Sequence, residues 1–226
     1  MKLPHHSTLL FIGDSITDAE RKPSGEACAW EPYFGFGYGY VSKIYGWLHA
    51  AHPEAAIRVV NKGISGNTVR ELAGRWQTDV LDIKPAVLCV MIGINDVWRQ
   101  FDSPQRPEIA VGPEEYRQTL AKLIASARTK VQSIYLASPY FIEPNRADPM
   151  RRRMDEYGAI VEELAAANDA VFVDAQAAFD RALVHLHPMA LAWDRIHPGP
   201  VGHMIIARAF LEAFGCLPTL PSLNSQ

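Results

Sequence analysis

Short apolar segments that alternate with amphipathic ones constrain this chain most. Residues 86–92 are apolar throughout, which is typical of a parallel strand buried on both faces of its sheet. Four further runs are predicted as strands by the same criterion: residues 8–12, 57–60, 134–137 and 170–173. Helices are expected near residues 39–51, 69–80, 113–127, 154–164, 175–187 and 199–214. Strands that alternate with helices in this way predict an α/β fold, a three-layer, doubly wound sandwich around a central parallel five-stranded sheet.

Composition limits the possible partners. Of 226 residues, 48% are hydrophobic, which is enough for a single domain over residues 1–226. We expect its core at about residues 8–214 and a flexible tail at 216–226. The net charge is −3, with 22 basic and 25 acidic residues, so no nucleic-acid partner is expected.

Membrane, secretion and metal signals are absent from the sequence. No stretch of 18 apolar residues is present, so we expect no membrane span. Residues 1–6 lack the apolar segment of a secretory signal, which favours a cytoplasmic protein. Cys28, Cys89 and Cys216 are too scattered for a disulfide framework or a zinc site, and Cys89 lies in an apolar run as a small core residue.

Ser15 stands where the first predicted strand ends. The apolar run 9–12 is followed by Gly13, Asp14 and Ser15. Glycine permits a sharp turn and a close approach of another group, and open α/β sheets hold their sites at the carboxyl ends of their strands. Ser15 is therefore a candidate nucleophile. The alternative is that Ser15 or Asp14 caps the next helix.

Five residues from distant segments form a possible catalytic set. Turns carrying Ser15, Gly66 and Asn95 follow the first three strands, whose ends lie side by side in a parallel sheet. Asp194 precedes His197 by three residues, so it can hold Nδ1 of the imidazole and leave Nε2 for the Ser15 hydroxyl. The N–H groups of Ser15 and Gly66 and the Asn95 amide are candidate oxyanion donors.

Each of these residues also has an ordinary structural interpretation. Taken alone, Asn95 fits a role as a turn cap as well as it fits a catalytic role, and Asp194 could cap the last helix. Asp14, Asp18 and Asp96 are expected first as local hydrogen-bond acceptors.

Other polar residues are expected to be structural. His185 and His187 do not share a helix face and lack a third metal ligand. Ser65 and Ser138 are rival nucleophiles without a motif, since no Gly-x-Ser-x-Gly elbow occurs. The arginines at 151–153 are predicted to form a solvated first helical turn, with a subunit contact as the less favoured interpretation.

Four blocks together resemble the SGNH hydrolases, the GDSL esterase family: residues 13–15, the Gly66 turn, residues 93–96 and residues 194–198. The resemblance covers about residues 8–214 and implies the flavodoxin-like form of the predicted sandwich. The longer strings 11–18, 60–69, 93–98 and 192–198 resemble the bacterial acetylxylan esterase branch. Ile16 replaces the leucine of some members, without consequence for the chemistry.

The resemblance implies a serine esterase that removes acetyl groups from xylo-oligosaccharides or related sugars through an acyl-enzyme intermediate, without metal or cofactor. It implies Ser15 as nucleophile, His197 as base and Asp194 as its orienter, with Ser15, Gly66 and Asn95 forming the oxyanion hole. A carboxylesterase, lysophospholipase or thioesterase would use the same set, whereas a carbohydrate-binding protein would not need it.

Further contacts are expected around this set. Asp14, Trp98 and Trp193 are candidate substrate contacts, and aromatic residues at 34–40 are expected to flank the site. Buried packing is the alternative for these aromatics. Homo-oligomerisation is an open expectation. A His197 base also predicts that activity falls towards acid pH.

Overall fold

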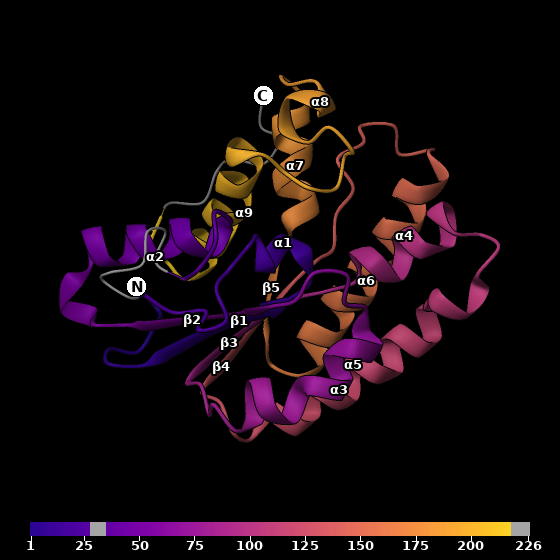
Figure 1. Ribbon diagram of the computed structural model, residues 1–226. Coiled ribbons are helices and arrows are strands. Elements are labelled where there is room, and N and C mark those ends of the chain that lie inside the picture. Colours follow the sequence, from indigo (N-terminus) through magenta and orange to yellow (C-terminus); the bar gives the residue numbers. More distant parts are fainter. Residues whose placement is uncertain (28–34, 218–226) are drawn as a thin grey trace.

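The parallel sheet is the centre of the computed structural model, which describes residues 1–27 and 35–217. Within these residues five strands form one sheet in the order β2-β1-β3-β4-β5, and every pairing is parallel (Figure 1). Their bounds are Thr8–Gly13 for β1, Arg58–Gly63 for β2, Val87–Met91 for β3, Ser133–Ala137 for β4 and Val171–Val173 for β5. The predicted fold class is confirmed.

Helices cover both faces of the sheet (Figure 1). One layer contains α2 (Tyr40–Ala51), α7 (Ala175–Leu183) and α9 (Pro200–Ala213). The other contains α3 (Val69–Trp76), α5 (Pro113–Arg128) and α6 (Pro149–Ala167). The remaining helices are α1 (Ser15–Asp18), α4 (Ile94–Asp102) and α8 (Pro188–Leu191), with 3-10 turns at Pro53–Ala55 and Pro107–Ile109 and a π-helical turn at Gln77–Leu81.

Local sequence signals explain where several helices begin. Thr68 and Glu71 form the capping box of α3, and prolines occupy the first turns of α5, α6 and α9, where a missing N–H costs no helical bond. In the core, Phe11 of β1 makes edge contacts with Tyr40 of α2 and Phe210 of α9, with ring centroids 5.7 and 5.5 Å apart. These aromatic contacts join one helical layer to the central strand.

Several segments differ from the prediction: α1 and α8 were not expected, and α6 begins at Pro149 instead of near residue 154. Asn95 was expected in a turn, but α4 begins at Ile94 and continues to Asp102. Ile94 and Val97 are buried and Trp98 is half-buried at helical spacing, a signal that the Asn-Asp pair obscured. The helix expected at 175–187 ends at Leu183. The expected tail at 216–226 lies outside the described residues from 218 onward, and so does Cys28.

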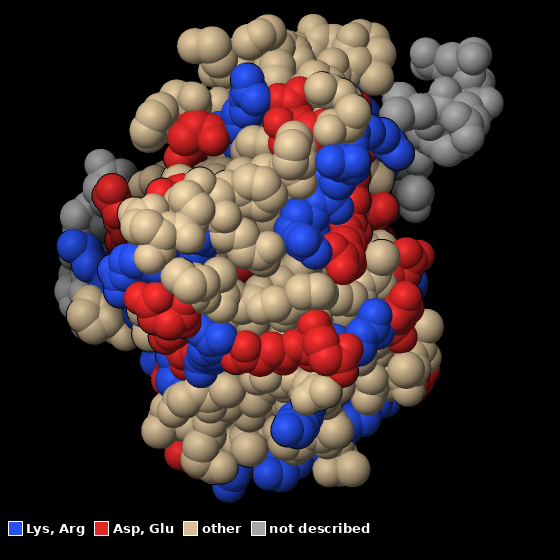
Figure 2. Space-filling model, turned by 90° about the vertical axis from the view of Figure 1, so that its right-hand side faces the viewer, with Lys and Arg blue, Asp and Glu red and all other residues tan. Residues whose placement is uncertain are grey.

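Charges of both signs are mixed on the face shown in Figure 2, where acidic and basic side chains lie next to one another. In the described part of the chain, no helix combines the length and the apolar character needed to cross a membrane.

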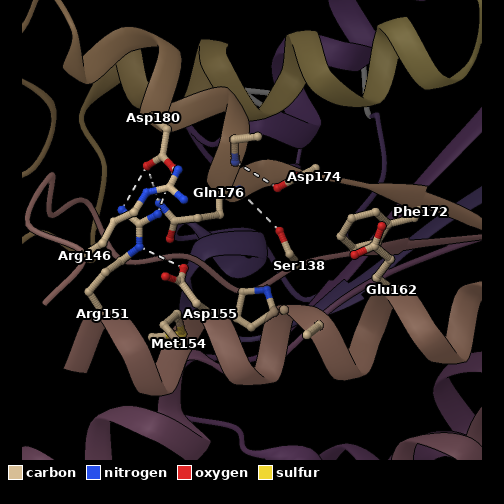
Figure 3. Close-up of a pocket in the computed structure, with 14 residues that line it drawn as sticks. Ser138, Arg146, Arg151, Met154, Asp155, Glu162, Phe172, Asp174, Gln176 and Asp180 are labelled. Carbon is tan, nitrogen blue, oxygen red and sulfur yellow. Dashed lines mark hydrogen bonds and ion pairs between the residues drawn. The ribbon is translucent and has the colours of Figure 1, made fainter. Parts of the chain in front are cut away.

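Arg151 contradicts the prediction of a solvated arginine turn. Its side chain is only 2% exposed and lies in a cleft of about 280 Å³ between α6 and α7 (Figure 3). Its guanidinium donates to both oxygens of Asp180, at 2.9 and 2.7 Å, and to Asp155 at 2.8 Å. It also donates to the Glu143 carbonyl at 2.5 Å. Arg151 is therefore a buried anchor.

The same cluster holds the segment that follows β4. Gln176 donates to Asp180 at 3.0 Å. Its side-chain amide also accepts from the Phe141 N–H at 2.8 Å and donates to the Phe141 carbonyl at 3.2 Å. Residues 141–143 are thereby fixed at two points.

We predict that Arg151→Met lowers the free energy of unfolding by about 3 kcal/mol, because the Asp180 carboxylate, whose side chain is 13% exposed, loses its two-bond partner and keeps the pair with the exposed Arg146. Urea unfolding measures the change. Arg153→Met is the matched control, since Arg153 pairs with Glu156 on the exposed side of the same helix, and we expect a change below about 1 kcal/mol. Equal effects of the two substitutions would contradict the anchoring role.

His203 is a second buried polar residue of the core. It is 2% exposed on α9, and Tyr38 lies edge-on to its ring at a centroid distance of 5.6 Å. Burial, with smaller contributions from the charges of Lys43 and His197, lowers the pKa of His203 to about 3. His203 is therefore neutral in the folded protein.

Because the unfolded chain binds a proton at His203 near pH 6.5 and the folded chain does not, stability falls as the pH drops from about 6.5 to about 3. His203→Phe keeps the ring and removes the titration. We predict that the free energy of unfolding of His203→Phe falls less steeply than that of the wild type between pH 7 and pH 4.5. Below pH 6.5 the two slopes are expected to differ by about 1.4 kcal/mol per pH unit. Urea unfolding at both values tests this, with the exposed His185→Gln as control. If the wild type and His203→Phe lose stability with pH at the same rate, His203 is not held in the neutral form by burial.

Candidate active site

Ser15 lies in the turn after β1, at the point where the connections between strands run to opposite sides of the sheet. In the order β2-β1-β3, the chain goes to one side after β1 and to the other with β3, which is where open α/β folds bind ligands. Gly13 is required here, because a Cβ at this position would lie 2.2 Å from the Met91 carbonyl oxygen. Asp14 then caps α1, its carboxylate accepting from the Ile16 N–H at 3.0 Å, and Ser15 is the first residue of α1.

A chain of two hydrogen bonds connects Ser15 to the last loop. Ser15 Oγ lies 3.0 Å from His197 Nε2, and His197 Nδ1 lies 2.6 Å from Asp194 Oδ2. A carboxylate can only accept, so Nδ1 carries the ring proton and Nε2 accepts from the serine hydroxyl. This arrangement prepares the hydroxyl for deprotonation.

The Asp194 carboxylate also holds its own loop. Its second oxygen accepts from the N–H groups of Ile196 at 3.0 Å and His197 at 2.8 Å. Burial raises the pKa of Asp194, but the bonds from the His197 ring and these N–H groups outweigh it, so the pKa lies below its ordinary value. Asp194 is therefore ionised and caps its own turn, not the last helix.

The loop after β4 braces the histidine loop. Arg195 has a φ of +63°, a strained value for a residue with a side chain. The Ile142 N–H donates to the Arg195 carbonyl at 3.0 Å, and the Tyr140 hydroxyl donates to the Ile196 carbonyl at 3.0 Å. Arg195 also pairs with Glu143. These contacts hold the strained conformation.

Gly66 and Asn95 come from the turns after β2 and β3. Gly66 has a φ of +82°, which favours glycine, while a Cβ there would meet no described atom within 4 Å. The backbone conformation, more than crowding, requires glycine. Asn95 Nδ2 donates to the Asn67 carbonyl at 3.0 Å, and its second amide hydrogen remains for a further acceptor.

The aspartates near Ser15 are structural. The Asp14 side chain is completely buried, which corrects the expectation that it contacts substrate. Burial raises the pKa of Asp14 to about 7, and the Ile16 N–H opposes this rise. Burial also raises the pKa of Asp96 to about 7, where the carboxylate accepts from the Val69 N–H at 3.0 Å. Asp18 accepts from Ser65 Oγ at 2.6 Å.

The candidate aromatic contacts lie in different environments. The Trp98 ring lies edge-on to His197 at a centroid distance of 5.7 Å, next to the triad. Trp193, the residue before Asp194, is 81% exposed. Of the aromatics expected at 34–40, Phe36 and Tyr40 are buried and Phe34 lies outside the described residues.

Ser65 lies next to Gly66 with its hydroxyl bonded to Asp18, and the other rival residues have structural partners of their own. Ser138 is buried, and its hydroxyl accepts from the Gln176 N–H at 3.2 Å. His187 accepts from the Met189 N–H and caps α8. Over residues 1–27 and 35–217, no group of three His, Cys, Asp or Glu side chains is arranged to hold a metal ion.

Arg75 is a site neighbour that the sequence reasoning missed. It lies on α3 and donates to the carbonyls of Gly13 and Lys62 and to the side chain of Asn67. Backbone carbonyls carry no residue-specific signal, so spacing alone offered no means of finding these contacts.

Comparison with known proteins agrees with this geometry. The model of the GDSL-like Lipase/Acylhydrolase family matches residues 11–205. An acetylxylan esterase of Geobacillus stearothermophilus is 51% identical over 95% of this chain and 97% of its own length. The crystal structure of that esterase, Axe2, superposes with a TM-score of 0.91 at 52% identity over 95% of this chain and 97% of the other. LAE5, an alpha/beta hydrolase from the metagenome of Lake Arreo, gives 0.93 at 51% identity over 97% of this chain and all of its own.

Variants of Axe2 described as catalytic mutants replace a serine, an aspartate or a histidine with alanine. The replaced aspartate and histidine lie three residues apart in that chain, as Asp194 and His197 do here. The family match over most of the chain and the shared overall structure lead to one conclusion: this chain belongs to the GDSL-like lipase/acylhydrolase family.

Proposed function

We propose that this chain, a carboxylic ester hydrolase by its family, removes acetyl groups from xylo-oligosaccharides or related acetylated sugars. The hydrogen-bonded series Ser15–His197–Asp194 carries the proposal, since it joins a nucleophile, a base and an orienting carboxylate. The 51% identity to an acetylxylan esterase supports the choice of substrate.

In the first half of the reaction, Ser15 Oγ attacks the acetyl carbonyl carbon while His197 Nε2 takes the hydroxyl proton. The resulting oxyanion is assigned to the N–H groups of Ser15 and Gly66 and to the Asn95 amide. Asp194 stabilises the imidazolium. When the tetrahedral intermediate collapses, the C–O bond to the sugar breaks and His197 returns the proton to the leaving sugar oxygen.

In the second half, His197 takes a proton from water, and the resulting hydroxide attacks the acetyl-Ser15 carbonyl. Collapse breaks the bond to Ser15 Oγ, which regains its proton from His197, and acetic acid leaves and ionises to acetate in the solvent. Every proton transfer in this sequence passes through His197, so the proposed residues balance the reaction without a metal or cofactor.

One sheet and one continuous core support the proposal that residues 1–226 act as a single domain. Homo-oligomerisation, a cytoplasmic location and the absence of nucleic-acid and membrane partners stay predictions from the sequence.

We predict that Ser15→Ala lowers acetate release from acetylated xylo-oligosaccharides by about 10³-fold or more, because no nucleophile remains. Ser138→Ala is the matched control and is expected to keep the rate within a few-fold. Butyryl and octanoyl esters are assayed in parallel, and an acetyl-sized pocket should reject them.

The other outcomes separate the alternatives. Preference for long chains would keep the triad but assign the protein to the lysophospholipases or thioesterases. Failure of the wild type to cleave any ester would favour a carbohydrate-binding protein and overturn the mechanism.

We also propose that Trp98 and Trp193 stack on sugar rings, with Trp98 supported by its position next to His197. We predict that Trp98→Ala lowers kcat/KM for acetylated xylose up to about tenfold, the value of one aromatic contact, and leaves 4-nitrophenyl acetate little changed. Trp47→Ala, on the exposed side of α2, is the control. Equal losses on both substrates would count against stacking.

A further inference from the structure

Arg75 makes four hydrogen bonds, and three of them reach segments that converge on the site. From α3, its guanidinium reaches Gly13 O at 2.8 Å, Lys62 O at 2.7 Å and Asn67 Oδ1 at 2.7 Å. Asp79, four residues further on, accepts its fourth bond at 2.9 Å. One side chain thus connects the end of β1, the end of β2 and the Gly66 loop.

These acceptors lie beside the proposed oxyanion donors. Gly13 is two residues before Ser15, and its carbonyl also accepts from the Ile64 N–H at 3.0 Å, in the loop that carries Gly66. Asn67 follows Gly66 and is held from two directions, by Arg75 at its side chain and by Asn95 at its backbone carbonyl. The three assigned donors are therefore joined through Asn67 and Gly13.

Donors of an oxyanion hole act together only when they point at one oxygen atom, and a shift of about 1 Å can cost about 10²-fold in rate. Gly66 has no side chain to fix its position, so its loop is held through its neighbours: Asp18 accepts from Ser65 on one side, and Asn95 and Arg75 donate to Asn67 on the other. A rigid, planar group with several donors is suited to hold such a loop against a strand end.

We propose that Arg75 is a positioning residue, which holds the Gly66 loop in register with the Ser15 turn so that the oxyanion donors converge. This inference rests on the proposed function and adds to it a residue that does not touch the substrate. Lysine cannot replace it fully, because one ammonium group cannot span the same acceptors.

Arg75→Met and Arg75→Lys test the proposal with 4-nitrophenyl acetate. We expect kcat to fall about 10²-fold in Arg75→Met and less in Arg75→Lys, with KM within about threefold of the wild type, because the loss is felt in the transition state. Arg70→Met on the same helix is the control, since Arg70 pairs with Glu115 at the surface. Arg75→Lys keeps the test possible if Arg75→Met does not fold.

Methylboronic acid, whose methyl group matches the acetyl group of the substrate, provides a readout that a purely structural role would not move. A bond forms between Ser15 Oγ and boron, the serine proton passes to His197, and the boronate oxygen occupies the oxyanion hole. We expect its inhibition constant to rise by about the same factor as kcat falls, while KM stays nearly constant. The proposal would be overturned if the Arg75 variants kept the wild-type inhibition constant or the wild-type kcat and differed only in a lower melting temperature.

Asn67→Ala removes the acceptor in the Gly66 loop. If Arg75 acts through this loop, the double variant Arg75→Met/Asn67→Ala is expected to be no slower than the slower single variant. Multiplied losses would overturn the proposal. Full activity of Ser15→Ala would instead refute the proposed function. The Ser15 and Arg75 variants therefore test the function and the positioning role separately.

Discussion

The register of the three neighbouring strands β2, β1 and β3 sets the geometry on which the site depends. Gly13 pairs with Gly63 on one side and with Met91 on the other, so all three strands end at one level. Space at this level is so restricted that a Cβ on Gly13 would collide with the Met91 carbonyl, and one on Gly63 would lie 2.1 Å from Asp18 N. Close strand ends therefore bring the Ser15 turn, the Gly66 loop and the start of α4 together.

The histidine half of the site requires a different support, because it lies near the other end of the chain. Its loop contains a strained residue, Arg195, and contacts the segment after β4 through Ile142 and Tyr140. That segment is held by Gln176 and by the buried Arg151–Asp180 pair. The distance between Ser15 and His197 is thus set by a series of contacts that passes through α6 and α7.

The sequence contained enough information for the reacting groups but not for their supports. Asp194 and His197 lie in one short loop, so their spacing alone predicted the hydrogen bond between them. The apolar runs likewise predicted the parallel sheet, and with it the meeting of the Ser15, Gly66 and Asn95 turns. Arg151 was predicted to be exposed because of its charge, but its position indicated burial. It precedes Met154 by three residues and shares that residue's buried face of the helix.

Arg75 and Arg151 both donate hydrogen bonds to backbone carbonyls near the site, one on each side of it. At the end of a parallel strand and in the loop that follows it, backbone carbonyls lack some or all of their ladder partners and require other donors. Arg75 supplies donors to Gly13 O and Lys62 O, and Arg151 to Glu143 O. Each guanidinium is also paired with a carboxylate, Asp79 or Asp180, which fixes its plane. Because such contacts join a side chain to backbone atoms of any residue type, they depend on the folded arrangement and leave no motif in the sequence.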